Sequence, residues 1–124
     1  MRKSSLLYTA LGLIIVLAML HFIAEAFYLY WTLWWFDIVM HLLAGFSGGL
    51  VVLWFLGPFN IFKSLIFTLI CVLVVGIAWE IFEYAYDLIQ AIDYWQDTML
   101  DLIFDVVGAT LAVCYASVQT PKSS

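Results

Sequence analysis

Apolar residues run along this chain in four long stretches, separated by short polar or turn-forming segments. We predict membrane-spanning helices over residues 6–27, 35–56, 64–89 and 98–117. Each stretch has about the 20 residues that an α-helix needs to cross a bilayer. Because the connections are short, consecutive helices should pack as antiparallel neighbours. The pattern therefore predicts an all-α integral membrane four-helix bundle, with a single domain over residues 1–124.

Composition excludes the soluble classes. Hydrophobic residues make up 67% of the chain and charged residues only 10%, whereas soluble domains are about half apolar and about a quarter charged. A soluble fold of 124 residues has too little interior to bury so much apolar surface. Nucleic acid is excluded as a partner because the chain has no basic patch. We expect a multi-pass protein of the inner (plasma) membrane whose main partner is the lipid bilayer.

The basic residues predict the orientation of the bundle. Arg2, Lys3, Lys63 and Lys122 all fall on one side of a four-span protein, and the positive-inside rule makes that side cytoplasmic. Both termini are then inside the cell. The outward loops carry the aromatic residues typical of a membrane interface, namely Tyr28, Tyr30, Trp31, Trp34, Tyr94 and Trp95.

Polar residues interrupt each predicted span at a spacing of three or four. The four sets are His21 and Glu25; Asp37 and His41; Glu80, Glu83 and Asp87; and Asp97, Asp101 and Asp105. Residues at this spacing share one helix face. With a rise of about 1.5 Å per residue, the four stripes lie at similar depths in the outer half. We expect them to meet inside the bundle, where ionisable residues of membrane helices normally face.

These acids have no basic partner at their depth. An acid in mid-helix costs roughly 2.5–3.5 kcal/mol on insertion scales, and protonation, water or a bound cation can relieve the cost. Carboxylates combined with imidazole suit Zn, Mn, Fe or Mg. We therefore predict a divalent metal site. Glu83 would lie beside it, either as a hydrogen-bond partner of the ligands or as a general base, and the predicted ligands are Asp37, His41, Glu80, Asp97, Asp101 and Asp105.

A polar network that only fixes helix packing is the competing interpretation of the same residues. Glu25 and Asp97 could equally be solvated acids at the interface, and His21 a hydrogen-bonded core histidine.

Three motifs in order resemble a known family. They are Asp37-x-x-x-His41, Trp79-Glu80-x-x-Glu83 and Asp97-Thr98-x-x-Asp101, with Gly108-Ala109 after them. They resemble the YjdF-like small bacterial inner-membrane proteins over about residues 35–110, and VanZ-like membrane proteins more weakly. The resemblance implies that the six ionisable motif residues form a site, and it leaves the activity open. Asp105 is additional to the family pattern. The chain is shorter than typical members, which suggests a lost partner surface or a homo-oligomer.

Three functions fit this site. The first is a metal-dependent membrane hydrolase, in which a metal activates water or polarises a phosphoryl oxygen of a lipid or lipid-linked headgroup. The second is ion or proton translocation through the acids. The third is a structural or interaction subunit without catalysis. Translocation fits poorly because two stretches of the inner half, residues 65–76 and 106–113, have no ionisable residue except Cys71.

The orientation can be tested directly. If both termini are cytoplasmic, a C-terminal fusion to a reporter active only in the cytoplasm should be active, because all four basic residues then lie inside. The same fusion to a reporter active only in the periplasm should be silent. The reverse pattern would contradict the predicted orientation and the depths derived from it.

Overall fold

The computed structural model describes residues 3–56, 60–85 and 94–119, and its ordered elements there are helices. They are α1 (Lys3–Phe27), α2 (Leu29–Thr32), α3 (Phe36–Leu56), α4 (Ile61–Ala85) and α5 (Tyr94–Gln119). The four long helices are long and apolar enough to cross a membrane, so the all-α four-span prediction is confirmed. α5 begins four residues earlier than predicted, and the predicted end of the third span at Ile89 lies outside the described residues.

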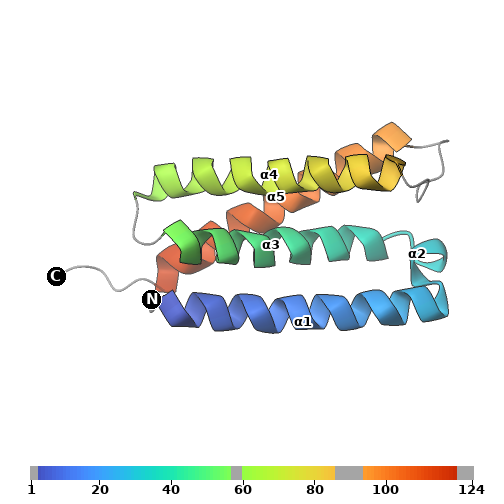
Figure 1. Ribbon diagram of the computed structural model, residues 1–124, viewed down its shortest axis with the longest axis horizontal. Coiled ribbons are helices and arrows are strands. Elements are labelled where there is room, and N and C mark those ends of the chain that lie inside the picture. The colour runs from blue at the N-terminus through green and yellow to red at the C-terminus, as the bar shows by residue number, and fades with distance from the viewer. Residues whose placement is uncertain (1–2, 57–59, 86–93, 120–124) are drawn as a thin grey trace.

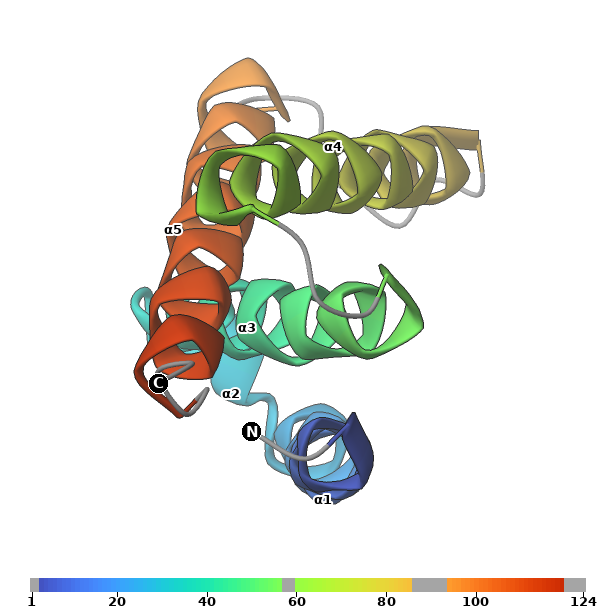
Figure 2. The ribbon, with the colours of Figure 1, turned by 90° about the vertical axis from the view of Figure 1, so that its left-hand side faces the viewer.

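Helix α3 occupies the centre of the bundle. It packs against α1, α4 and α5, and its contact with α5 is the most extensive in the protein. Figure 1 shows α1, α3 and α4 lying alongside one another, with α5 crossing obliquely behind them, and Figure 2 shows α5 flanking α3 and α4 on one side. The start of α1 and the end of α5 lie at the same end of the molecule, as four spans require.

Glycine allows α3 and α5 to touch through their backbones. A Cβ atom added to Gly45 would collide with the backbone of Asp105, and one added to Gly108 would collide with the backbone of α3 at Leu42 and Phe46. One turn further on, a Cβ on Gly49 would lie 2.8 Å from the Cβ of Ala112. Small residues four apart are how membrane helices achieve such close approach. The crossing fixes the register of α3 against α5 beside the predicted site.

Apolar packing holds α1 against the rest of the bundle. Near the start of α1, the small and aliphatic side chains of Leu6 and Ala10 pack with buried residues of α3 and α5, including Leu50 and Ala112. Near its end, Ala24 packs with residues at the start of α3. The outward faces of the long helices carry many exposed large apolar side chains. Such faces suit contact with lipid, since the bilayer interior solvates apolar groups.

The connection between α1 and α3 turns sharply at Tyr28, which adopts a left-handed conformation (φ 57°). The Tyr28 carbonyl accepts hydrogen bonds from the backbone amides of Trp31 and Thr32 at 3.2 and 3.1 Å. Tyr28, Trp31 and Trp34 are exposed, as the predicted aromatic interface requires. Tyr30 differs, because it is only partly exposed and its ring packs edge-on against Phe36. The side chains of Tyr94 and Trp95 lie outside the part that the structure describes.

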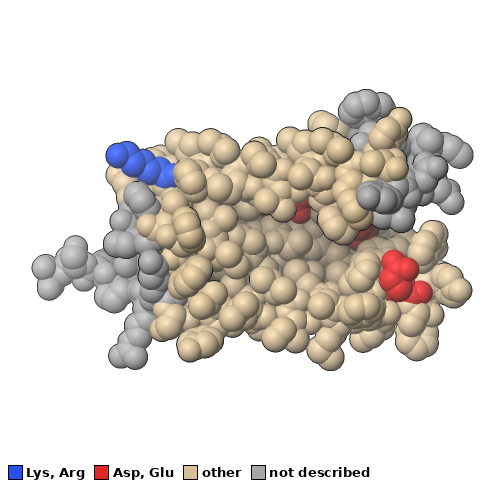
Figure 3. All heavy atoms as spheres, in the orientation of Figure 1, with Lys and Arg blue, Asp and Glu red and all other residues tan. Residues whose placement is uncertain are grey.

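Charge is segregated along the bundle. In Figure 3 the Lys and Arg atoms lie at one end, and the Asp and Glu atoms lie toward the opposite end. The surface between α4 and the α1–α3 pair is hollowed, and acidic atoms are visible in the floor of this groove (Figure 3). The acids that the structure describes thus lie away from the end of the bundle that carries Lys63.

The close crossing makes a prediction about two neighbouring glycines. Gly45→Ala should lower the apparent melting temperature in detergent, because overpacking a tight contact typically costs about 1–3 kcal/mol and the backbone of Asp105 cannot yield. Gly48→Ala is the matched control: an added Cβ there meets nothing within 4 Å, and alanine favours the helix by up to about 1 kcal/mol. Equal melting temperatures for the two variants would contradict the backbone contact.

Candidate metal centre

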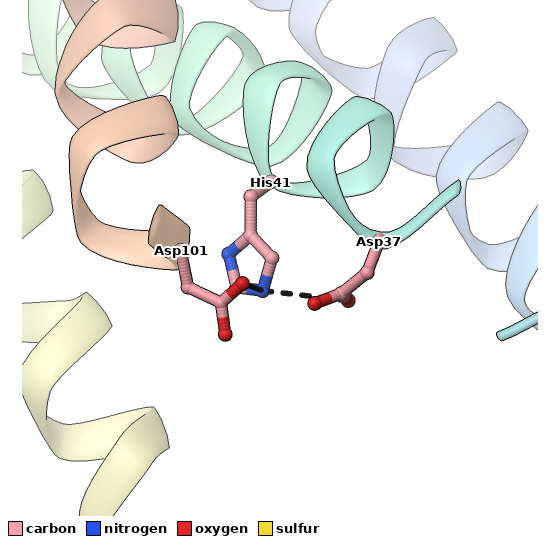
Figure 4. Close-up of side chains that lie close together, drawn as sticks. All are labelled: Asp37, His41 and Asp101. Atoms are coloured by element: carbon pink, nitrogen blue, oxygen red, sulfur yellow. Dashed lines mark ion pairs between the residues drawn. The ribbon is translucent and has the colours of Figure 1, made fainter. Parts of the chain in front are cut away.

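Three carboxylates surround the imidazole of His41. Its Nδ1 atom lies 3.0 Å from Asp105 Oδ1, within hydrogen-bonding distance. Its Nε2 atom lies 3.3 Å from Asp101 Oδ1 and 3.7 Å from Asp37 Oδ1. Figure 4 shows the Asp37 and Asp101 carboxylates approaching the same edge of the ring from α3 and α5. The Gly45–Gly108 crossing makes this possible, because His41 lies one turn before Gly45 and Asp101 lies two turns before Gly108.

Burial deepens across this group of residues. The side chain of Asp37 is 35% exposed, that of His41 is 14% exposed and that of Asp101 only 4%. Asp37 also lies in the first turn of α3, where the positive end of the helix dipole favours a carboxylate. The group is therefore accessible from outside at Asp37 and buried at Asp101.

A second group of acids continues from the first onto α4. Glu80, Glu83 and Asp101 each offer an oxygen, and the three oxygens lie within 4.8 Å of one another. Glu80 is only 3% exposed. Its Oε2 atom accepts a hydrogen bond of 3.1 Å from the Thr98 hydroxyl, whereas its Oε1 atom is buried with no hydrogen-bond partner. One oxygen of a buried acid is thus left without a partner, although buried polar atoms are nearly always paired.

The rim of the second group is formed by Glu83, which is partly exposed. Its Oε1 atom accepts a 2.7 Å hydrogen bond from the indole nitrogen of Trp79, one turn earlier on α4. A glycine of α4 makes room for the deeper acid: a Cβ on Gly76 would lie 2.9 Å from Asp105 Oδ2. Helix α4 therefore contacts the acids both at the rim, through Glu83, and in the interior, where Gly76 faces Asp105.

The structure brings together six of the seven residues predicted for the site. They come from three helices and are Asp37, His41, Glu80, Glu83, Asp101 and Asp105. Among the described residues, two groups have a geometry that could hold a cation: Asp37 with His41 and Asp101, and Glu80 with Glu83 and Asp101. Asp105 lies outside both, on the other edge of the imidazole. Asp97 belongs to α5, but its side chain lies outside the described part of the structure.

The expectation that all four polar stripes meet is wrong for α1. His21 and Glu25 are both exposed. Helix α1 packs through a stripe that includes Leu17, Leu20 and Ala24. His21 and Glu25 follow this stripe by one residue and are rotated from it by roughly 100°. The cluster is therefore built by α3, α4 and α5.

Three residues around the cluster were not predicted as part of it. Thr98 shares the face of Asp101 and Asp105 by helical spacing, and Trp79 precedes Glu83 by four residues, so their spacing could have indicated both. Tyr30 had been assigned to the aromatic interface. Its hydroxyl oxygen lies 3.0 Å from Nδ1 of His21.

The charge of the cluster reaches Tyr30. Burial is the largest effect and the negative charges of Asp37, Glu25 and Glu83 add to it, so that the pKa of Tyr30 is raised to about 12. Its hydroxyl is neutral at pH 7, as that of an ordinary tyrosine is, and the raised pKa extends the neutral form to more alkaline solution.

Comparison with known protein families gives a match over nearly the whole chain. Residues 1–122 match a family described as "Predicted membrane protein (DUF2238)". No curated protein and no solved structure matches the chain. The match does not test the resemblance to YjdF-like or VanZ-like proteins, which stays a prediction. Since the match extends over nearly the whole chain and the structure has four potential membrane spans, this multi-pass membrane protein belongs to the DUF2238 family of predicted membrane proteins.

Proposed function

We propose that the cluster between α3, α4 and α5 binds a divalent metal ion and that the protein is a membrane metalloenzyme acting on a lipid or lipid-linked headgroup. One observation carries the proposal: His41 directs Nε2 at the oxygens of Asp101 and Asp37, 3.3 and 3.7 Å away, while Nδ1 is held by Asp105. A metal-bound histidine usually has its second ring nitrogen fixed by a carboxylate in this way.

Charge balance supports a cation. Lys63 is the one Lys or Arg whose side chain the structure describes. It lies near the start of α4, whereas Glu80 and Glu83 lie near the end of the same helix. Carboxylates this close repel one another unless a proton or a cation lies between them. A divalent ion would balance two negative charges and give their lone pairs a partner.

The donor set suits a borderline or hard metal ion. Carboxylates with one imidazole favour Zn, Mn, Fe or Mg over the soft metals that thiolates select. In our proposal Asp37, His41 and Asp101 are ligands of the ion. Asp105 orients His41 from the opposite edge, a different role from the ligand role that the sequence suggested.

The shape of the site favours a substrate that arrives from the membrane. The groove in Figure 3 lies on the side of the bundle, between α4 and the α1–α3 pair, and acidic atoms are visible in it. Exposed apolar side chains, among them Trp79 and Phe82, lie on α4 beside the acids. A lipid could place its headgroup at the cluster while its chains stay in the bilayer. With the proposed orientation, this would be the outer leaflet.

Hydrolysis of a phosphate ester is the reaction that these residues could support. A bound divalent ion would polarise a phosphoryl oxygen and lower the pKa of water. Water would attack phosphorus as the ester P–O bond breaks. Glu83 would accept the proton of that water and return it to the departing alcohol oxygen. Trp79 holds Glu83 through Oε1, which orients the carboxylate and leaves Oε2 outside that hydrogen bond.

Metal binding is the first prediction of the proposal. Protein purified in detergent without a polyhistidine tag or chelator should carry a divalent ion. His41→Ala and Asp37→Asn should lose it, because each removes a ligand. Asp105→Asn should only weaken binding, by roughly 10–100-fold, as expected when an orienting carboxylate is removed. Mass spectrometry of the metals measures the content.

His21→Ala is the matched control, since His21 is exposed and lies in neither of the groups that could hold a cation. It should keep the metal. Wild-type protein free of divalent metal would contradict the proposal.

A second prediction separates a catalyst from a scaffold. Glu83→Gln should keep the fold and the ion at His41 but abolish release of headgroups from phospholipid vesicles, because glutamine cannot accept the proton. Melting temperature, metal content and headgroup release are measured on the same sample. If the cluster were only structural, removing a member would leave buried partners unsatisfied, and stability would fall without any enzymatic activity in the wild type.

A further inference from the structure

We infer that the cluster holds two divalent ions, with the Asp101 carboxylate bridging them. The first ion is the one proposed above, at Asp37, His41 and Asp101. The second would lie between Asp101, Glu80 and Glu83. The inference rests on the proposed metal site and deepens it, because a pair of ions is a different catalytic centre from a single one.

The geometry of Asp101 is the first argument. It is the one residue that belongs to both groups, and within each group the donor atoms lie within 4.8 Å of one another. Its Oδ1 atom faces His41 Nε2 at 3.3 Å. Figure 4 shows the other oxygen turned away from the imidazole. A carboxylate that belongs to two adjacent groups of donors is suited to bridge ions, which in two-metal enzymes lie about 3.5–4 Å apart.

Glu80 supplies an independent argument. It is 3% exposed, and its Oε2 atom is satisfied by Thr98. Its Oε1 atom is buried without a hydrogen-bond partner. Leaving a buried carboxyl oxygen unpaired is costly. The ion proposed at Asp37, His41 and Asp101 does not have Glu80 among its ligands. A second ion at Glu80 gives this oxygen its partner.

The two positions differ in chemistry. The His41 group offers a nitrogen donor, which suits Zn, Fe or Mn, whereas the Glu80 group offers only oxygen, which suits Mg or Mn. Mn²⁺ is compatible with both and is paramagnetic, so it is the appropriate probe. In this arrangement Asp101 and Glu80 hold the second ion, and Glu83 lies beside it as the proton acceptor proposed above. Glu83→Gln would still stop turnover while the ion at His41 remained.

The test is a Mn²⁺ titration of the full-length chain in detergent, without a polyhistidine tag. Bound Mn²⁺ is counted by mass spectrometry, and electron paramagnetic resonance shows whether the ions are magnetically coupled. We expect about two ions per chain and a coupled spectrum, because a carboxylate bridge holds ions about 3.5–4 Å apart.

Glu80→Gln should halve the stoichiometry and convert the spectrum to that of isolated Mn²⁺. Glu25→Gln is the matched control, the same substitution at an exposed acid of α1, and it should bind as the wild type does. Melting temperatures show whether both variants fold. If Glu80→Gln does not fold, the wild-type stoichiometry and coupling decide alone.

The outcomes distinguish the proposed single-ion site from the two-ion inference. One uncoupled ion per chain would overturn the two-ion inference and leave the proposed single-ion site standing. No bound ion would overturn both. Two ions that persist unchanged in Glu80→Gln would overturn the assignment of the second ion to Glu80.

Discussion

The contact between the backbones of α3 and α5 is the constraint on which the rest of the structure depends. Gly45 and Gly108 leave no room for a side chain between the two helices. This closeness lets the short aspartate side chains of α5 reach the imidazole of His41 on α3. Apolar packing alone would hold the helices together at a larger separation. The glycines therefore serve the polar cluster as well as the fold.

Burying the acids of the cluster costs free energy, because carboxyl groups lose their hydration inside the bundle. Asp101 and Asp105 are buried. The one basic side chain that the structure describes, Lys63, lies near the start of α4, whereas the acids of that helix lie near its end. A structural network could be built more cheaply from neutral side chains, since amides and hydroxyls carry no charge to desolvate. Our account of this cost is that the acids balance the charge of bound metal ions. The groove of Figure 3 then gives a lipid headgroup a route to them.

Sequence periodicity predicted much of this arrangement for a physical reason. Apolar stretches of about 20 residues have few alternatives to membrane helices, and acids three or four apart share a face. Periodicity cannot say which face of a helix packs inward, and so it failed for His21 and Glu25 on α1. It also cannot say which edge of His41 each aspartate meets, because that depends on the crossing of α3 and α5. Tyr30 was missed because an inward tyrosine and an interfacial one look alike in sequence.

The most direct test of the central claim is to detect nitrogen coordination at the bound metal. The chain has two histidines, His21 and His41, so the measurement can be assigned. Electron spin echo modulation of the Mn²⁺-loaded protein should show one directly bound imidazole nitrogen. The account predicts that the signal survives in His21→Ala and vanishes in His41→Ala. A wild-type spectrum without bound nitrogen, or a signal that persists in His41→Ala, would contradict it.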